Sequence, residues 1–78
     1  MKPIPSVPLG KYRHFKGNYY ELTAVGRDSE NPDNFLAVYR ALYGEGEVWI
    51  RPLDMFFEAV EKGGEKTARF EYVEEIPE

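Results

Sequence analysis

Residues 38–60 read VYRALYGEGEVWIRPLDMFFEAV, and this stretch decides the fold. Two runs rich in β-branched and aromatic residues flank Gly44-Glu45-Gly46, a tight turn typical of a β-hairpin. Pro52 then suits the first turn of a helix, where its missing N–H costs nothing. The apolar residues with the spacing of one buried helical face are Leu53, Phe56, Phe57 and Val60. We therefore predict a hairpin followed by a short helix that ends at Gly63-Gly64.

Alternating or continuous apolar runs predict five strands in the chain. They cover residues 11–16, 19–25, 35–43, 47–51 and 67–73. The third run is apolar on both faces, which predicts a strand inside the sheet. The expected fold is mainly β with one short helix, either a small five-stranded SH3-like barrel or a strongly curled antiparallel sheet. An open sheet with the helix packed on one face is the main structural alternative.

The length of 78 residues indicates one small domain, which must bury a dense core to be stable. Six Tyr, five Phe and one Trp can supply that core. No cysteine is present, so neither a disulfide nor a thiolate metal site can hold the fold together. We expect an extended Pro-rich arm at residues 1–9, a single β domain at residues 10–73 and an acidic tail at residues 74–78.

The charge is uneven along the chain. The chain has 10 Lys and Arg residues and 14 Asp and Glu residues. Residues 1–40 contain six of the basic and four of the acidic residues, whereas residues 41–78 contain four basic and ten acidic residues. The net charge of −4 argues against a general nucleic-acid binder but permits a local positive patch. Because residues 1–10 lack the apolar run of a signal peptide and no segment is long and apolar enough to span a membrane, we expect a cytoplasmic protein.

Several separated segments carry a resemblance to a known family. They are GKYRHFKGNYYEL at 10–22, DSEN at 28–31, the stretch 38–60 quoted above, and ARFEYV at 68–73. Together they resemble the domain-of-unknown-function family 1653, short bacterial proteins that also occur as one domain of longer chains. The resemblance implies no assigned activity. The chain departs from the family pattern at Asp28, where the family has His before Ser-Glu, and at Ala68, which replaces a Pro.

Aromatic residues interleaved with cations form the most suggestive constellation. They are Tyr12, Tyr19, Tyr39, Tyr43 and Trp49, with Lys11, Arg13, Lys16, Arg40 and Arg51. Such a surface suits stacked bases and phosphates of a single-stranded nucleic acid, or a Pro-rich peptide. The same residues also serve a small β core whose aromatic rings are covered by Arg and Lys stems. The candidate ligand-binding residues are Tyr12, His14, Lys16, Tyr39, Tyr43, Trp49 and Arg51.

A hydrolytic or small-molecule pocket would need His14, Ser29, Glu30 and Arg51 around one point. A lone histidine is more commonly a surface residue or a hydrogen-bonded strand residue than a catalytic one. Arg51, at the junction of strand and helix, either binds an anion or pairs with Asp54, Glu21 or a backbone carbonyl. We assign no catalytic residue.

The sequence contains no motif that indicates a metal or cofactor site. One histidine without cysteine does not make a zinc site, and the acidic loop lacks the spacing of a calcium loop. Gly44-Glu45-Gly46 has no phosphate-loop lysine after it. We therefore expect no metal and no cofactor.

The favoured interpretation is a non-enzymatic binding module that contacts a protein or nucleic-acid partner through an aromatic and basic face. The alternatives are the pocket around His14 and an accessory protein that oligomerises through an edge strand.

Overall fold

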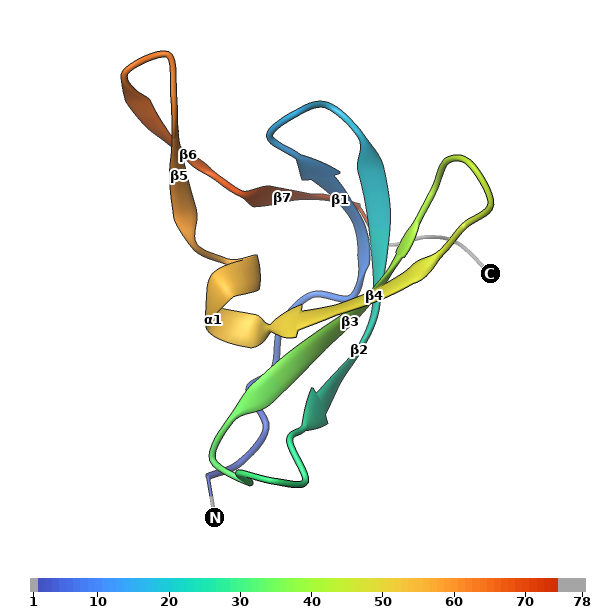
Figure 1. The fold of residues 1–78 in the computed structure, drawn as a ribbon, viewed down its shortest axis with the longest axis vertical. Helices are drawn as coiled ribbons and strands as arrows, with labels where there is room; N and C mark the ends of the chain where they lie inside the picture. Colours follow the sequence, from blue (N-terminus) through green and yellow to red (C-terminus); the bar gives the residue numbers. More distant parts are fainter. Residues whose placement is uncertain (1, 75–78) are drawn as a thin grey trace.

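Five strands form one antiparallel sheet in a computed structural model of the chain, which describes residues 2–74 (Figure 1). In spatial order they are β4 (Val48–Pro52), β3 (Phe35–Ala41), β2 (Tyr19–Arg27), β1 (Gly10–His14) and β7 (Phe70–Glu74). β4 and β7 are the edges and do not pair with each other, so the described strands form a curled open sheet and not a closed barrel. The prediction of a mainly β fold with a curled antiparallel sheet is confirmed.

One face of this sheet, termed the inner face, carries the core. The register sets Tyr12 of β1 opposite Tyr20 and Tyr72, and Leu22 of β2 opposite Tyr39. Because side chains alternate along a strand, these residues point to the same side. The buried core consists of Tyr12, Leu22, Ala37, Tyr39, Leu53, Phe56 and Phe70. β3 lies between β2 and β4, as the sequence predicts for the strand with two apolar faces.

The helix α1 (Leu53–Phe56) follows β4 and covers the inner face (Figure 1). The ring of Phe56 is fully buried, stacks on Phe70 at 4.1 Å between centroids and meets the edge of Tyr12 at 5.2 Å. Pro52, predicted in the first turn of the helix, instead stands directly before it as the N-cap and the last residue of β4. No helix within residues 2–74 is long and apolar enough to cross a membrane.

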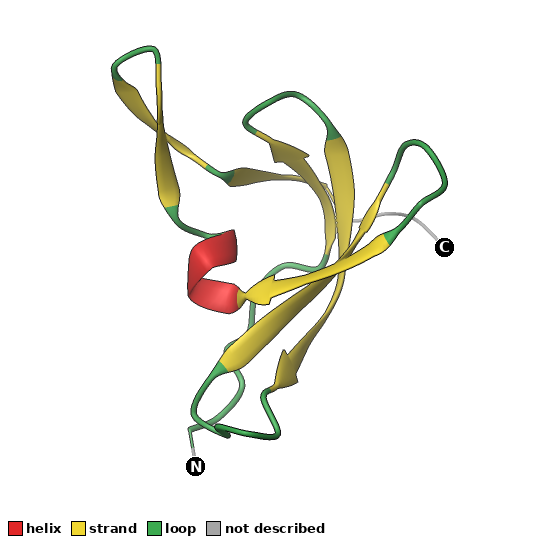
Figure 2. Cartoon of the chain, in the orientation of Figure 1, coloured by secondary structure: helices red, strands yellow, loops and turns green. Residues whose placement is uncertain are grey.

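The prediction that the helix continues to Gly63-Gly64 is wrong. Figure 2 shows a single helical turn followed by a hairpin of β5 (Ala59–Lys62) and β6 (Glu65–Ala68). Gly63 and Gly64 form the turn of this hairpin, with φ of 61° and 84°. Positive φ at a Gly pair suits a tight hairpin turn as well as a helix end, so the glycines alone do not distinguish the two.

The last predicted strand, residues 67–73, is divided in two. β6 ends at Ala68 and β7 begins at Phe70, so the chain leaves one sheet and enters the other at Arg69. The backbone N–H of Arg69 donates to the carbonyl of Glu58, and its carbonyl accepts from the N–H of Phe15. These two bonds tie the backbone of Arg69 to the segment between α1 and β5 and to the turn after β1.

The N-terminal segment runs from residue 2 to the start of β1 without helix or strand. Val7 packs against the core, and the hydroxyl of Tyr12 donates to the carbonyl of Pro8 at 2.6 Å. Burial, followed by the neighbouring Tyr72, raises the pKa of Tyr12. Most of the predicted acidic tail, residues 75–78, lies outside the described residues.

Candidate ligand-binding face

Part of the inner face next to α1 remains exposed and gathers aromatic rings and cations. Tyr20 of β2 lies at its centre, with ring centroids of Tyr39, Tyr43 and Phe70 each 5.5 Å away and that of His14 at 6.1 Å. Trp49 stands opposite Tyr39 in the register of β3 and β4. We define the open face as His14, Tyr20, Tyr43, Trp49, Arg51 and Arg69.

Tyr20 and Tyr43 share a hydrogen bond between their hydroxyls at 2.6 Å. Burial, this hydrogen bond and the neighbouring tyrosines raise the pKa of Tyr20 to about 12. Tyr20 is therefore a neutral phenol at physiological pH, and it can present one polar group without adding negative charge.

His14, at the end of β1, presents a neutral ring to the open face. Its Nδ1 accepts a hydrogen bond from the backbone N–H of Lys16 at 3.2 Å, which in the neutral ring leaves the proton on Nε2. Burial lowers the pKa of His14, and the positive charges of Arg69, Lys16 and Arg51 lower it further. The ring is therefore a neutral donor near pH 7.

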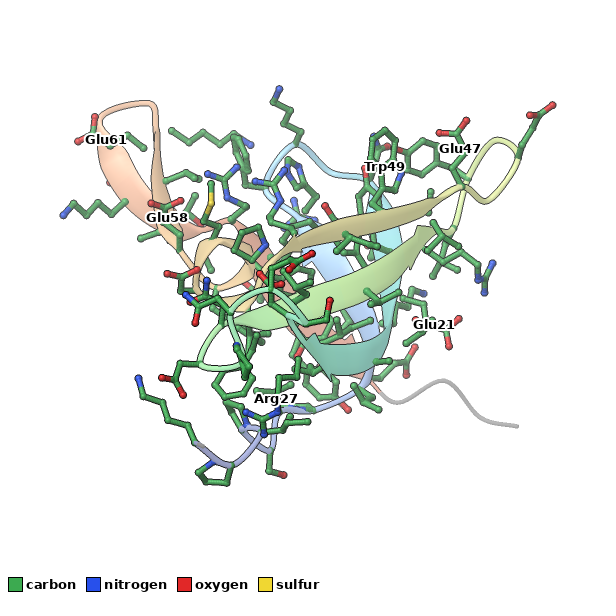
Figure 3. All side chains as sticks on the ribbon, turned by 60° about the horizontal axis from the view of Figure 1, so that its bottom comes forward. Glu21, Arg27, Glu47, Trp49, Glu58 and Glu61 are labelled. Carbon is green, nitrogen blue, oxygen red and sulfur yellow. The ribbon has the colours of Figure 1, made fainter. Side chains whose placement is uncertain are left out.

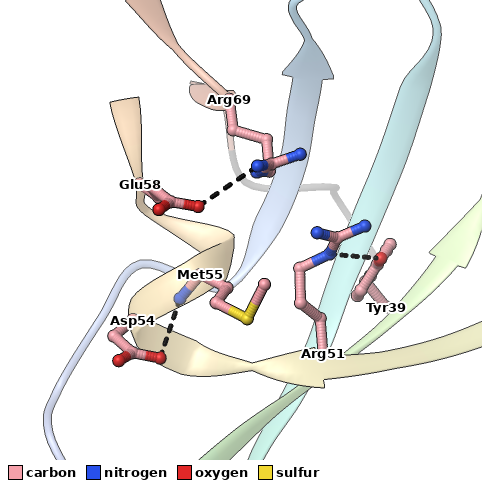
Figure 4. A network of polar contacts seen from close by, with 6 residues as sticks. All are labelled: Tyr39, Arg51, Asp54, Met55, Glu58 and Arg69. Carbon is pink, nitrogen blue, oxygen red and sulfur yellow. Dashed lines mark hydrogen bonds and ion pairs between the residues drawn. The ribbon is translucent and has the colours of Figure 1, made fainter. Parts of the chain in front are cut away.

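Arg51 reaches from β4 over the inner face. Its Nε donates to the hydroxyl of Tyr39 at 3.3 Å (Figure 4). The two carboxylates that the sequence suggested as ion-pair partners of Arg51 bind other groups. Glu21 pairs with Arg40 at 2.7 Å, and Asp54 accepts a hydrogen bond from the backbone N–H of Met55. Within residues 2–74 Arg51 has no ion pair.

Arg69 was not among the sequence candidates, yet its guanidinium lies on the same side of α1 as that of Arg51 (Figure 4). Its Nη2 pairs with Glu58 at 3.2 Å, while its Nε is buried with no partner among the described residues. A buried donor without an acceptor costs about 1–3 kcal/mol. The sequence did contain a signal that could have pointed to Arg69: it directly precedes Phe70, a core residue, in the last segment that resembles the family.

Trp49 and Arg51 lie on the inner face of β4, and Glu47 directly precedes that strand. Glu47, Trp49 and Arg51 occupy alternate positions, and Figure 3 shows Glu47 and Trp49 near the hairpin turn. Trp49 is 47% exposed and Tyr43 46%. The two rings border a hollow of about 260 Å³ that is lined by Ala41, Tyr43, Gly44, Glu45, Glu47 and Trp49.

The remaining candidates lie elsewhere. Tyr12 is 1% exposed and belongs to the core, so it is not part of the open face. Tyr39 is 5% exposed and contributes chiefly its hydroxyl to Arg51. The ammonium of Lys16 lies over the ring of Phe15 at 5.8 Å in the turn after β1.

The other aromatic and cationic residues of the constellation include a pair on the opposite, outer face of the sheet. Lys11 and Tyr19 form a cation–π contact there at 4.8 Å. Arg40, which pairs with Glu21, belongs to the same outer face because it alternates with Tyr39 along β3. Lys11 and Arg40 are therefore engaged on the outer face, which is separate from the open face.

The hydrolytic set does not assemble. Ser29 and Glu30 follow β2 in the loop at the bottom of Figure 1, whereas His14 lies near the opposite end of that strand. β2 has nine residues and is about 26 Å long. Since a general base must lie within hydrogen-bond reach of its nucleophile, His14 cannot act on Ser29. Nor do residues 2–74 contain a group of three metal-ligating side chains.

The comparisons with known proteins agree with the resemblance seen in the sequence. The model of the family described as protein of unknown function (DUF1653) matches residues 10–72. The chain belongs to the DUF1653 family. A crystal structure of a DUF1653 protein from Bordetella bronchiseptica is similar to this chain at 30% identity and a TM-score of 0.80, covering 92% of this chain and 94% of the other. No curated protein matches the chain.

Proposed function

We propose that this DUF1653 protein is a non-enzymatic binding module that holds a single-stranded nucleic acid on the open face. The observation that supports this most strongly is that the guanidinium groups of Arg51 and Arg69 lie on the same side of α1 (Figure 4), while Trp49, two residues before Arg51 on β4, keeps a half-exposed ring. Exposed rings next to cations suit successive bases and phosphates of a single strand.

The rings supply affinity that does not depend on base identity. Trp49 and Tyr43 are each nearly half exposed although the chain has a dense aromatic core in which to bury rings. Stacking a base on such a ring contributes about 1–3 kcal/mol. A Pro-rich peptide would also use these rings, but it gives no role to two guanidinium groups, so we favour the nucleic acid.

The charges limit the size of the contact. The chain carries a net charge of −4, so a long phosphate backbone is repelled by most of its surface. Arg51 and Arg69 provide a small positive area, in which Glu58 is the carboxylate bonded to Arg69. We therefore expect contact with only one or two phosphates and a weak dependence of affinity on salt.

The surroundings of His14 support the proposal of binding without catalysis. In the described part of the chain its hydrogen bond is to the backbone N–H of Lys16, and no Ser, Thr or carboxylate is bonded to its ring. Without a bonded nucleophile or an orienting carboxylate, the ring lacks the partners of a nucleophilic catalyst.

Fluorescence anisotropy of a labelled single-stranded RNA at several salt concentrations tests the proposal. For one or two phosphate contacts, the logarithm of the association constant should fall with that of salt with a slope of about −0.7 to −1.4. Trp49→Ala should weaken binding at least about fivefold. Tyr19→Ala, which removes an exposed ring from the outer face, is the matched control and should leave the affinity unchanged. Retention of a Pro-rich or acidic peptide without RNA binding would overturn the proposal.

A further inference from the structure

We infer that Arg51 and Arg69 form a site for the phosphate group of a nucleotide, which orients that nucleotide along β4 with its base on Trp49. This inference rests on the proposed function, and it adds where the phosphate lies and in which direction the nucleotide runs.

The two guanidinium groups have more N–H donors than there are acceptors bonded to them. Arg51 uses Nε for Tyr39, and Arg69 uses Nη2 for Glu58. The rest of their N–H groups have no acceptor within residues 2–74, and one of them, Nε of Arg69, is buried. Two like charges on the same side of α1 repel each other, and an anion between them would replace that repulsion with charge-assisted hydrogen bonds.

Both arginines are held before any ligand arrives. The hydroxyl of Tyr39, a buried residue of β3, fixes Nε of Arg51, so the terminal nitrogens of Arg51 remain free on the side where Arg69 lies (Figure 4). Glu58 fixes Arg69 from the segment after α1. Because an ordered guanidinium loses little entropy on binding, this arrangement favours a planar fork-like contact with phosphate oxygens.

The order of Glu47, Trp49 and Arg51 along the chain gives the bound nucleotide a direction. Trp49 and Arg51 follow one another on the inner face of β4 at a step of about 7 Å, and Glu47 lies just before the strand, at the hollow that Trp49 borders. The carboxylate of Glu47 repels phosphate from one end of this segment, and Arg51 attracts it to the other. A base stacked on Trp49 would then lie one step from its own phosphate at Arg51, a separation comparable with that within one nucleotide. On its other side, Glu47 can accept a hydrogen bond from an exocyclic amino group.

His14 reports the occupancy of this site. The charges that act on its ring are those of Arg69, Lys16 and Arg51, with Glu58 paired to Arg69 and the phenol of Tyr20 beside the ring. A phosphate bound between the two arginines offsets their charges, so the pKa of His14 should rise on binding. His14 is the only histidine, so its ring signals in an NMR spectrum need no assignment among several.

Three probes separate the phosphate from the base. Inorganic phosphate should raise the pKa of His14, whereas chloride at equal ionic strength should not. Adenosine should quench the fluorescence of Trp49 and leave the pKa of His14 unchanged. Adenosine 5′-monophosphate should do both and bind at least tenfold more tightly than adenosine.

Variants test the assignment to the two arginines. Arg51→Gln and Arg69→Gln should each remove the response of His14 to phosphate, and Arg51→Lys should retain part of it. Arg40→Gln, which removes a cation from the outer face, is the control and should respond like the original chain. Since Arg69→Gln can disturb the fold through Glu58, the titration of the unaltered chain with phosphate remains the primary measurement.

Each outcome bears on one of the two proposals. If phosphate leaves the pKa of His14 unchanged, or if adenosine binds as tightly as its monophosphate, the phosphate site is refuted even where RNA binds through Trp49. If phosphate binds as expected but RNA does not bind, the nucleic-acid function is refuted and the anion site stands.

Discussion

The Nε of Arg51 donates a hydrogen bond to the hydroxyl of Tyr39 across neighbouring strands at 3.3 Å. Tyr39 is almost fully buried and its ring meets Phe56 and Phe70 edge-on, so its hydroxyl is held by the core. The core therefore positions a cation of the open face. The same hydrogen bond therefore bears on the stability of the fold and on the affinity of the candidate site, and a single variant can test both.

Tyr39→Phe should weaken the binding of adenosine 5′-monophosphate about tenfold, because Arg51 loses the acceptor that orients it. The free energy of unfolding should change by less than about 1.5 kcal/mol, since the ring and its packing remain. Calorimetric titration and urea unfolding of the same variant measure the two effects. An unchanged affinity would show that this hydrogen bond does not prepare Arg51 for a ligand.

Phe56→Ala should remove most of the stability of the domain. The ring is fully buried and stacked on Phe70, and truncating such a ring costs about 3–5 kcal/mol. Because small domains are stable by roughly 5–15 kcal/mol, the variant should unfold at far lower urea concentrations. Phe56→Leu keeps much of the volume and serves as the milder comparison. A loss below about 1 kcal/mol would contradict the position of α1 against the inner face.

Trp49→Ala should leave the fold nearly intact. The ring is 47% exposed on the edge strand β4, so its removal should change the free energy of unfolding by no more than about 1 kcal/mol. Urea unfolding followed by circular dichroism gives the value, because the variant lacks the tryptophan signal. A cost equal to that of Phe56→Ala would place Trp49 in the core and remove it from the open face.

Lowering the pH should destabilise the chain through His14. Burial and the charges of Arg69, Lys16 and Arg51 lower the pKa of His14 in the folded chain below its ordinary value of 6.5. The unfolded chain then binds more protons in the range below pH 6.5, so the stability contributed by the neutral ring is complete above that value and decreases as the pH falls. Urea midpoints at about pH 7.5 and about pH 5 measure the change.

His14→Asn isolates this effect from the carboxyl groups, which titrate in both chains. The variant should lose less stability than the original chain between the two pH values. Equal losses would show that the protonation of His14 is not linked to folding.

Local signals in the sequence predict much of the fold. The glycines at 44 and 46 both take positive φ in the turn before β4, and Pro52 marks the boundary between β4 and the helix, one position before the first turn in which it was predicted. These features depend on residues within a few positions of one another. For that reason the hairpin, the beginning of α1 and the internal position of β3 could all be predicted.

Features that depend on distant pairing could not be predicted. Val60 has the spacing of a helical face with Phe56, yet it lies in β5 opposite Thr67, since pairing with a later segment decides between helix and hairpin. The contact of Arg51 with Tyr39 and the approach of Arg69 to the same region arise from the order of strands in the sheet. Aromatic and basic composition could suggest a ligand face, but it could not separate the buried Tyr12 from the exposed Trp49.

The most direct test of the open face is a fluorescence titration of the unaltered chain with a short single-stranded RNA at low salt. Trp49 is the only tryptophan, so its emission reports on this face alone. Our account predicts saturable quenching that Arg51→Gln weakens and that Tyr19→Ala leaves unchanged. Emission that stays constant while the RNA is bound, or quenching that persists at full strength in Arg51→Gln, would contradict it.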